Sequence, residues 1–465
     1  MRNMDCDTLV VGAGGGGYPA AFRLGARGQR VVMADPRGNL GGHCLYEGCI
    51  PSKTVREASV LLDSAGRGGR AGVPLALAGD SAAMWPRVRR FKDDVQTRRY
   101  AQHAEEIKTA ANLTFLAGSA ELLDAHTARI STAEDEWRVH FQWAILATGS
   151  SAHTLDTVPD AWTSHDVFAW QESIAHLPGR LVIIGGGYIG VELAMMLKPF
   201  GIHLTVLEMA PKVLPQMDEE IQTAIGAALG QVADVVVNAR VLKVSGGPGQ
   251  RVVQFQTSAG IRELAADEVL VATGRVPNVE HLGLDAAGIA YSRHGITVDA
   301  ALRTSVPHIF ACGDVNGQSM LFHAAVRMSQ VAAANILSHP TPVDQFSAGE
   351  MPATVFSTPE AHTVGLTLQA AQAEGIDAVE VRRPMGVEAR AQIAEELRGF
   401  LKMVVDRDRG TVLGIHAVGV DAADLAAVSH IIVRERRTLD DVAHMTFPHP
   451  TQFEMFDRLA RDASR

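Results

Sequence analysis

A glycine-rich turn between a short apolar strand and a small-residue helix occurs twice in this chain. In each copy a second strand follows the helix and ends at an acid, Asp35 or Glu208, 18 residues beyond the last glycine. Such glycines allow a pyrophosphate to approach a helix N-terminus, and the acid accepts hydrogen bonds from ribose hydroxyls. One Gly-x-Gly-x-x-Gly is weak evidence, but two copies in matching contexts predict that the chain binds two dinucleotides. The glycines are Gly12, Gly14 and Gly17 in the first copy and Gly185, Gly187 and Gly190 in the second.

Strands and helices alternate over the first two-thirds of the chain, a pattern typical of parallel sheets with crossover helices. A chain of 465 residues is also too long for one core. We therefore expect an α/β protein with two Rossmann-like dinucleotide-binding domains and a C-terminal α+β domain. The predicted boundaries are 1–150 for the first nucleotide-binding domain, 151–275 for the second, 276–348 for a segment that completes the first, and 349–465 for the C-terminal domain.

Finer expectations concern single segments. The sequence predicts a first strand over Thr8–Val11 and a surface loop over Ser64–Gly79, which is rich in Gly, Ala and Arg. In the C-terminal domain it predicts strands at 399–405 and 412–418, followed by a helix at 425–434.

Charge and composition exclude several classes of protein. The net charge of −10, without a cluster of Lys or Arg, argues against nucleic-acid binding. No apolar run is long enough to span a membrane, and the short polar N-terminus leaves no room for a signal peptide. Four cysteines are too few for a disulfide scaffold, so a cytoplasmic protein is expected, in which a close cysteine pair is catalytic or binds metal.

Such a pair lies in Gly-Gly-His-Cys-Leu-Tyr-Glu-Gly-Cys-Ile-Pro-Ser-Lys (41–53). The spacing of Cys44 and Cys49 is not a common zinc spacing and no second pair could complete a site, so no metal is expected even with His43 beside them. Lys53 follows Cys49 by about one helical turn, and a nearby cation and a helix N-terminus both lower a thiol pKa. Two buried reduced cysteines near a turn are the plain alternative. Because the pair follows the first nucleotide unit, the sequence favours a redox-active disulfide beside a flavin.

Six motifs, in this order, resemble those of the flavin-dependent pyridine nucleotide-disulfide oxidoreductases, and among them most of all the dihydrolipoamide dehydrogenases. The resemblance covers essentially the whole chain and implies FAD and NAD as cofactors, a homodimer, and a lipoylated carrier protein or domain as partner. The motifs are the first glycine turn, the cysteine run, Gly-Gly-Gly-Tyr-Ile-Gly-Val-Glu (185–192), Ala-Thr-Gly-Arg-Val-Pro-Asn (272–278), Ile-Phe-Ala-Cys-Gly-Asp-Val (309–315) and Phe-Pro-His-Pro-Thr-Gln-Phe-Glu (447–454).

The resemblance also implies roles for single residues around the flavin. The first glycine turn and Asp35 would hold the ADP half of FAD, and Asp314 would bind the ribitol. Lys53 would lie near the flavin N5 region, paired with Glu192. The remaining FAD contacts would come from Gly118, Thr148, Gly149, Ser150, Met320, Leu321 and His323.

For the second nucleotide, the resemblance implies that Tyr188 shields the flavin until the nicotinamide enters, with Val241 and Gly274 also lining that site. Glu208 favours NAD over NADP, because a carboxylate accepts hydrogen bonds from a free 2′-hydroxyl and repels a 2′-phosphate. Met209–Lys212 offers one Lys and no Arg to hold such a phosphate. His449 and Glu454 would come from the partner subunit and act as base and orienting carboxylate.

In the implied reaction, a dihydrolipoyl thiol attacks Cys44, and Cys49 then passes the electrons through the flavin to NAD⁺. The two other cysteines, Cys6 and Cys312, are interpreted as small buried apolar residues.

Some positions depart from the usual pattern of the family, and these are His43, Tyr46, Glu47, Asp35 and Phe447. They suggest a divergent paralogue that serves another lipoyl carrier. A reductase that uses NADH on a different disulfide, and a catalytically weak subunit kept for docking to a lipoyl-carrier assembly, stay open as alternatives.

Overall fold

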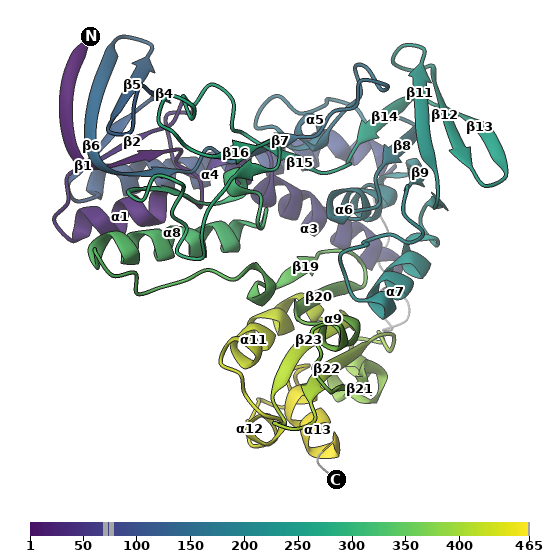
Figure 1. The fold of residues 1–465 in the computed structure, drawn as a ribbon. Coiled ribbons are helices and arrows are strands. Elements are labelled where there is room, and N and C mark those ends of the chain that lie inside the picture. The colour runs from purple at the N-terminus through teal and green to yellow at the C-terminus, as the bar shows by residue number, and fades with distance from the viewer. Residues whose placement is uncertain (68–72, 74–78, 464–465) are drawn as a thin grey trace. The chain divides into compact units, whose positions relative to one another are not determined.

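The structure is a computed structural model that describes residues 1–67, 73 and 79–463 (Figure 1). It divides into two compact units. The first comprises 1–154, 162–177 and 274–348, and the second comprises 155–161, 178–273 and 349–465. The boundaries of the four domains expected from the sequence stay a prediction.

A sheet with strand order β3-β2-β1-β6-β5-β4, in which β18 also pairs with β6, forms the centre of the first unit. Helices α1 (Tyr18–Ala26) and α8 (Phe322–Leu337) lie side by side against it (Figure 1). Strand β1 is longer than the predicted Thr8–Val11 because its polar first half pairs with β6, from Arg2 opposite Trp137 onward. The strands are β1 (Arg2–Val11), β2 (Val31–Ala34), β3 (Leu113–Leu116), β4 (Gly118–Leu122), β5 (Thr127–Thr132), β6 (Glu136–Leu146) and β18 (Ile309–Ala311).

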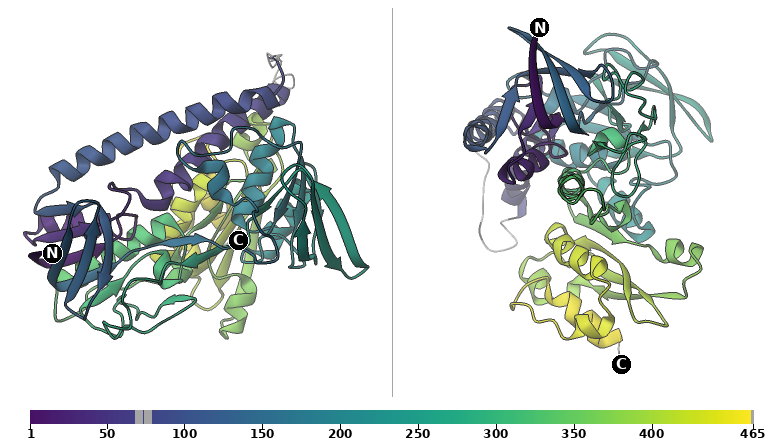
Figure 2. Two further views of the ribbon diagram at one scale, coloured as in Figure 1. Left: turned by 90° about the horizontal axis from the view of Figure 1, so that it is seen from above. Right: turned by 60° about the vertical axis from the view of Figure 1, so that its left-hand side comes forward.

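Two long helices of the first unit, α3 (Cys49–Arg67) and α4 (Trp85–Thr109), pack along each other (Figure 2). The predicted loop over Ser64–Gly79 is wrong at its start, because α3 continues to Arg67 through a stretch that contains no proline; residues 68–72 and 74–78 lie outside the described part. The shorter elements of this unit are α2 (Gly42–Tyr46), η1 (Ala82–Met84), α5 (Ser164–Phe168), η3 (Asp314–Asn316), and the ribbons β7 (Ser150–Ala152) with β15 (Arg275–Pro277) and β16 (Tyr291–Ser292) with β17 (Gly295–Ile296).

The second unit holds a parallel sheet, β10-β9-β8-β14, which repeats the strand–turn–helix arrangement of the first. An antiparallel sheet, β11-β12-β13, packs beside it around Val253 and Phe255. The elements are β8 (Arg180–Ile184), α6 (Tyr188–Leu197), η2 (Lys198–Phe200), β9 (His203–Leu207), α7 (Glu219–Leu229), β10 (Asp234–Val236), β11 (Arg240–Ser245), β12 (Arg251–Thr257), β13 (Gly260–Ala266) and β14 (Glu268–Val271).

An antiparallel sheet, β19-β20-β23-β22-β21, organises the C-terminal part of the second unit, so the expected α/β class with an α+β C-terminal part is confirmed. The predicted strands correspond to β22 and β23 and the predicted helix to α11, each within a few residues. The elements are η4 (Ala348–Glu350), β19 (Ala353–Val355), β20 (Glu360–Gly365), α9 (Leu368–Ala373), β21 (Ala378–Pro384), η5 (Met385–Val387), α10 (Ala389–Ile393), β22 (Phe400–Asp406), β23 (Val412–Gly419), α11 (Ala422–Arg434), α12 (Leu439–Ala443) and α13 (Glu454–Ala463).

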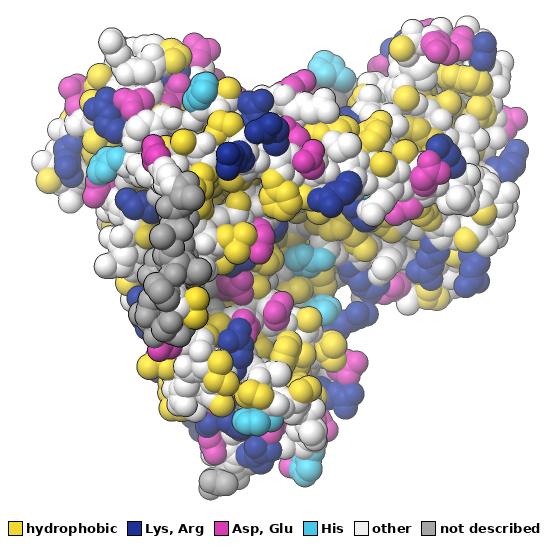
Figure 3. Space-filling model, turned by 180° about the vertical axis from the view of Figure 1, so that it is seen from behind, with side chains coloured by type: hydrophobic (Ala, Val, Ile, Leu, Met, Phe, Trp, Pro, Cys, Tyr) yellow, Lys and Arg dark blue, Asp and Glu magenta, His cyan; other side chains and the backbone are white. Residues whose placement is uncertain are grey.

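Charged side chains of both signs are interspersed on the face drawn in Figure 3. Within the described residues, no helix is both long and apolar enough to cross a membrane.

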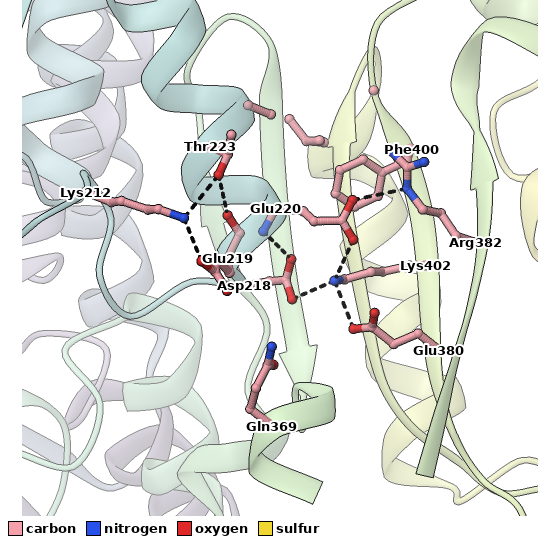
Figure 4. Close-up of a pocket in the computed structure, with 13 residues that line it drawn as sticks. Lys212, Asp218, Glu219, Glu220, Thr223, Gln369, Glu380, Arg382, Phe400 and Lys402 are labelled. Carbon is pink, nitrogen blue, oxygen red and sulfur yellow. Dashed lines mark hydrogen bonds and ion pairs between the residues drawn. The ribbon is translucent and has the colours of Figure 1, made fainter. Parts of the chain in front are cut away.

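A buried lysine joins the nucleotide-binding and C-terminal parts of the second unit (Figure 4). The side chain of Lys402, on β22, is 3% exposed, and its ammonium lies 2.8 Å from Asp218, 3.2 Å from Glu220 and 3.0 Å from Glu380. Asp218 also accepts a hydrogen bond from the Glu220 amide at the start of α7. The lysine therefore neutralises carboxylates from α7 and β21 at once.

Replacing Lys402 with Met should destabilise the protein by about 3–5 kcal/mol, because the substitution leaves the buried Asp218 carboxylate without its counter-ion. Thermal or urea unfolding of the FAD-loaded protein measures the effect. The exposed Lys243 on β11 provides the control, since Lys243→Met should shift the unfolding free energy by no more than about 0.5 kcal/mol. Equal stability of the two variants would contradict the assigned role.

Candidate active site

The first glycine turn is built so that side chains are excluded at two of its three glycines. Gly12 has φ +102°, and a Cβ there would lie 2.2 Å from the carbonyl oxygen of Ala147. A Cβ at Gly17 would lie 2.0 Å from the carbonyl oxygen of Gly12. At Gly14 the nearest atom to an added Cβ is 3.8 Å away. The space in front of Gly14 is thus open at the N-terminus of α1, where a phosphate can bind.

The second glycine turn repeats this construction almost contact for contact. Gly185 has φ +112°, with a Cβ position 2.5 Å from the Ala272 carbonyl oxygen, and a Cβ at Gly190 would lie 1.9 Å from the Gly185 carbonyl oxygen. Nothing lies within 4 Å of the Cβ position at Gly187. Both turns therefore have the geometry that lets backbone amides approach a pyrophosphate.

The two acids also hold equivalent positions at their turns. Asp35 accepts hydrogen bonds from the amides of Ala13 and Arg37, both at 2.8 Å. Glu208 accepts them from the amides of Gly186 and Ala210, both at 2.6 Å. Each carboxylate is thereby fixed beside its turn and keeps lone pairs that can accept ribose hydroxyls.

Several residues predicted to line the flavin site come together in the first unit. A Cβ at Gly16 would lie 2.6 Å from the Cys312 carbonyl oxygen, so the segment that carries Asp314 packs tightly on the glycine turn. Ser150 donates a 2.5 Å hydrogen bond to Asp314. Arg275 donates to the Ser150 hydroxyl at 2.7 Å and to its carbonyl oxygen at 2.6 Å.

The neighbouring Thr148 is fixed in the same way. Its hydroxyl donates to the Asn278 carbonyl at 2.8 Å, and the Asn278 amide donates to the Thr148 carbonyl at 2.9 Å. Gly149, between Thr148 and Ser150, has φ +73°. Sequence reasoning missed Arg275 and Asn278, although both lie in the quoted motif at 272–278.

A buried polar atom suits this unit to a dinucleotide. The Tyr46 side chain is 6% exposed, and its hydroxyl has no hydrogen-bond partner among the described residues. Burial raises the pKa of this phenol, and the charges of Tyr100 and Asp35 raise it further. An unsatisfied hydroxyl close to Asp35 fits a site that takes the polar adenosine half of FAD.

The remaining residues predicted to contact the flavin also belong to the first unit. The Gly118 amide donates a 3.1 Å hydrogen bond to the Asp35 carbonyl. Met320 and Leu321 are half-buried and His323 is exposed at the start of α8. Their contact with a flavin stays a prediction.

The cysteine pair lies at the junction of two helices. Cys44 belongs to α2 and Cys49 begins α3. The two are thiols hydrogen-bonded to each other, and this bond, followed by burial, raises the pKa of Cys44. The structure thus describes the reduced pair, and the predicted disulfide stays a prediction for the oxidised protein. The burial predicted for Cys6 and Cys312 is confirmed at 3% and 1% exposure.

Backbone contacts hold residues 42–49, here the cysteine loop, against the first glycine turn. A Cβ at Gly42 would lie 2.9 Å from the Gly14 Cα, so the start of α2 touches that turn. The buried Gln96 side chain donates to the carbonyl oxygens of Leu45 and Tyr46, both at 2.9 Å. The dithiol is therefore held beside the dinucleotide turn.

In the second unit Tyr188 begins α6, and burial together with the Glu192 charge raises the pKa of its phenol to about 12. The Glu192 carboxylate accepts a 2.9 Å hydrogen bond from the Phe356 amide. Lys53 lies in α3 of the first unit, so its pairing with Glu192 stays a prediction. The same holds for the nucleotide contacts of Val241, on β11, and Gly274, which has φ +113°.

A histidine–carboxylate pair stands at the start of α13. His449 Nδ1 lies 3.0 Å from Glu454 Oε2. Burial acts to raise the pKa of Glu454, but the hydrogen bonds from His449 and the Thr451 amide and the charge of Arg458 leave it below its usual value. The ionised Glu454 orients the ring, whose side chain is 66% exposed. This arrangement suits a base that acts on a group from outside its own chain.

No group of three or more His, Cys, Asp or Glu side chains within the described part of the chain is arranged to hold a metal ion.

Known proteins resemble this chain over its whole length. The family model described as pyridine nucleotide-disulphide oxidoreductase matches residues 6–329, and that family's dimerisation domain matches 351–460. A dihydrolipoyl dehydrogenase of Geobacillus stearothermophilus is 34% identical, covering 97% of this chain and 95% of the relative, and one of Bacillus subtilis is 32% identical with the same coverage.

A solved structure of the HOCl-induced flavoprotein disulfide reductase RclA from Escherichia coli is 27% identical, with a TM-score of 0.82 over 98% of this chain and 99% of that one. LpdA from Mycobacterium tuberculosis shares the fold, with a TM-score of 0.89 at 24% identity over 98% and 99% of the two chains. The family uses FAD and NAD(H), which confirms the predicted cofactors at that level. The chain therefore belongs to the pyridine nucleotide-disulfide oxidoreductase family and carries that family's dimerisation domain.

Proposed function

We propose that this protein is an NAD-dependent dihydrolipoamide dehydrogenase that works as a homodimer and oxidises dihydrolipoyl groups on a carrier protein or domain. One observation carries the proposal: the hydrogen-bonded thiols of Cys44 and Cys49 lie next to a dinucleotide-binding turn, through the contact of Gly42 with Gly14. The curated relatives at 34% and 32% identity, both named dihydrolipoyl dehydrogenase, support the choice of substrate.

The chemistry begins with the oxidised pair. A dihydrolipoyl thiolate attacks Cys44 Sγ, the Cys44–Cys49 bond breaks, and Cys49 leaves as a thiolate. The second dihydrolipoyl thiolate then attacks the substrate sulfur bonded to Cys44, which closes the lipoyl ring and releases Cys44. Two electrons now reside in the cysteine pair, which is left as a dithiol.

Proton transfer falls to His449 of the partner subunit. Each substrate thiol must lose its proton to become a nucleophile, and an imidazole titrates in the right range. The Glu454 carboxylate accepts a hydrogen bond from Nδ1–H of that ring, which leaves Nε2 as the base. The exposure of the His449 side chain supports an action across a dimer interface.

FAD supplies the path for the electron pair from the dithiol to NAD⁺, which receives it as hydride. Asp35 and the first glycine turn would hold the ADP half, and Asp314, which accepts a hydrogen bond from Ser150, would hold the ribitol. Lys53 would support the reactive part of the flavin, with Glu192 as its proposed partner. The FAD channel would be further lined by Gly118, Thr148, Gly149, Met320, Leu321 and His323. The nicotinamide nucleotide would be held by Gly185, Gly187, Gly190, Glu208, Val241 and Gly274, with Tyr188 as the shield.

A reductase that transfers electrons from NADH to another disulfide is the second candidate. The similarity to RclA, named a flavoprotein disulfide reductase, favours it. So do the unusual residues His43, Tyr46 and Glu47 within the cysteine loop.

The purified protein should reduce NAD⁺ with dihydrolipoamide, with a kcat/KM higher than that for NADH-dependent reduction of other small disulfides. Cys44→Ser and Cys49→Ser should abolish this activity while FAD absorbance is retained, because serine cannot form the disulfide. Cys6→Ala, at the buried cysteine of β1, should keep it. Turnover by either serine variant at the native rate refutes the mechanism, and a preference for another disulfide establishes the second candidate.

The protein should prefer NAD⁺ to NADP⁺ by about 100-fold in kcat/KM, since bringing a 2′-phosphate beside the Glu208 carboxylate costs several kcal/mol. Glu208→Gln should reduce this ratio to within about tenfold by removing the repelling charge. The exposed Glu263→Gln on β13 should leave the ratio unchanged. Steady-state kinetics with both nucleotides measures the ratio, and a lower KM for NADP⁺ in the native protein refutes the role of Glu208.

A further inference from the structure

One carboxylate beside the cysteine pair binds three cationic or ionisable side chains. Glu47 accepts a hydrogen bond from Arg37 at 2.6 Å and lies 3.1 Å from His43 Nδ1, and its other oxygen contacts His165 Nδ1. These four residues are called the Glu47 cluster. They come from three places in the first unit: the turn after β2, the cysteine loop, and α5.

One member of the cluster, His43, lies beside the backbone that joins the two cysteines. His43 precedes Cys44 in α2, and the His43 Cδ2 atom lies 2.9 Å from the Cβ position at Gly48, the residue before Cys49. The imidazole therefore packs on the backbone between the two thiols. A larger residue at Gly48 would displace it.

Aromatic rings hold the outer side of the cluster. The Arg37 guanidinium lies over the Tyr46 ring at 4.7 Å from its centroid. That ring in turn packs near Tyr100 and Trp170, at centroid distances of 6.3 and 6.0 Å. The three unusual residues of the loop, His43, Tyr46 and Glu47, thus belong to one packed arrangement.

Glu47 and Cys49 share a cationic neighbour, Arg275. Burial acts to raise the pKa of Glu47, but hydrogen bonds from His43 and His165 and the charge of Arg37 hold it well below its usual value, so the group is an anion at neutral pH. Burial lowers the pKa of His43, and the charge of Arg275 lowers it further. Glu47 and Asp314 act to raise the same pKa but do not outweigh burial. Burial also lowers the pKa of Arg275, while Asp314, Glu47 and Cys49 raise it. Glu47 and Cys49 therefore lie in the field of the same guanidinium.

An anion near a thiol disfavours the thiolate, and a cation favours it. Thiolate formation stabilises the reduced pair, so these charges act on the redox equilibrium. Glu47 and Arg37 should act on it with opposite signs.

We propose that the Glu47 cluster positions the Cys44–Cys49 loop and tunes its redox equilibrium, with the Glu47 charge opposing reduction of the pair and the Arg37 charge favouring it. The inference rests on the proposed function only in treating the two cysteines as a redox couple. It does not depend on which dithiol is the substrate. All members of the cluster are positioning residues, because they act through the cysteines.

The test equilibrates the FAD-loaded protein with buffers of reduced and oxidised dithiothreitol and counts alkylated cysteines. Cys6 and Cys312 are buried, so the signal reports the pair. Glu47→Gln should raise the equilibrium constant for reduction by about tenfold, which is about 30 mV for a two-electron couple. Arg37→Gln should lower it by a similar factor, and the double variant should return near the native value.

A matched control is the exposed ion pair of Glu121 and Arg129, in the same unit, with side chains 41% and 40% exposed. Glu121→Gln and Arg129→Gln should leave the equilibrium unchanged. FAD content and the thermal midpoint of each variant report folding, and Glu47→Asp, which keeps the charge, should stay near the native constant.

The proposal is overturned if Glu47→Gln and Arg37→Gln shift the equilibrium constant in the same direction, because loosening of the cysteine loop alone would have that effect. It is also overturned if neither variant shifts the constant, because the cluster then has no influence on the cysteine pair. If the native protein forms no disulfide at any ratio of the buffer, the proposed function itself fails. That outcome is distinct from a disulfide whose equilibrium ignores the cluster.

Discussion

The contact between Gly42 and Gly14 is the constraint on which the rest of the candidate site depends. With the Cβ position of Gly42 only 2.9 Å from the Gly14 Cα, neither the start of α2 nor the glycine turn can move away without breaking the packing of both. The contact brings the two thiols to the turn that is predicted to bind a dinucleotide. It makes the cysteine pair at the junction of α2 and α3 a candidate partner for a flavin.

The same backbone solution serves both nucleotide sites, although their sequences share little beyond the glycines. In each, a Cβ added at the first or third glycine would lie 1.9–2.5 Å from a carbonyl oxygen. The acid of each site accepts hydrogen bonds from two backbone amides. The surroundings differ: the first turn packs against the cysteine loop and the Asp314 segment. The predicted flavin site thus differs from the predicted nicotinamide site in the segments that pack against its glycine turn.

Much of the fold could be predicted from the sequence, because glycine turns and alternating apolar strands are local patterns with local causes. The pairing of His449 with Glu454 was also predictable, since the two residues are only five positions apart in the sequence. Arg275, Asn278 and His165 were not assigned roles, because their partners lie far away along the chain. His43 and Glu47 were seen only as unusual, since a sequence shows that a residue departs from a pattern but not what it contacts.

The proposed chemistry depends on Cys44 and Cys49 forming a redox couple that shares electrons with the flavin. Anaerobic reductive titration of the purified FAD-loaded protein tests it most directly, because the disulfide and the flavin each accept an electron pair. The native protein should take up about four electrons per FAD before reduction is complete, and Cys44→Ser should take up about two. Uptake of about two electrons by the native protein would contradict it.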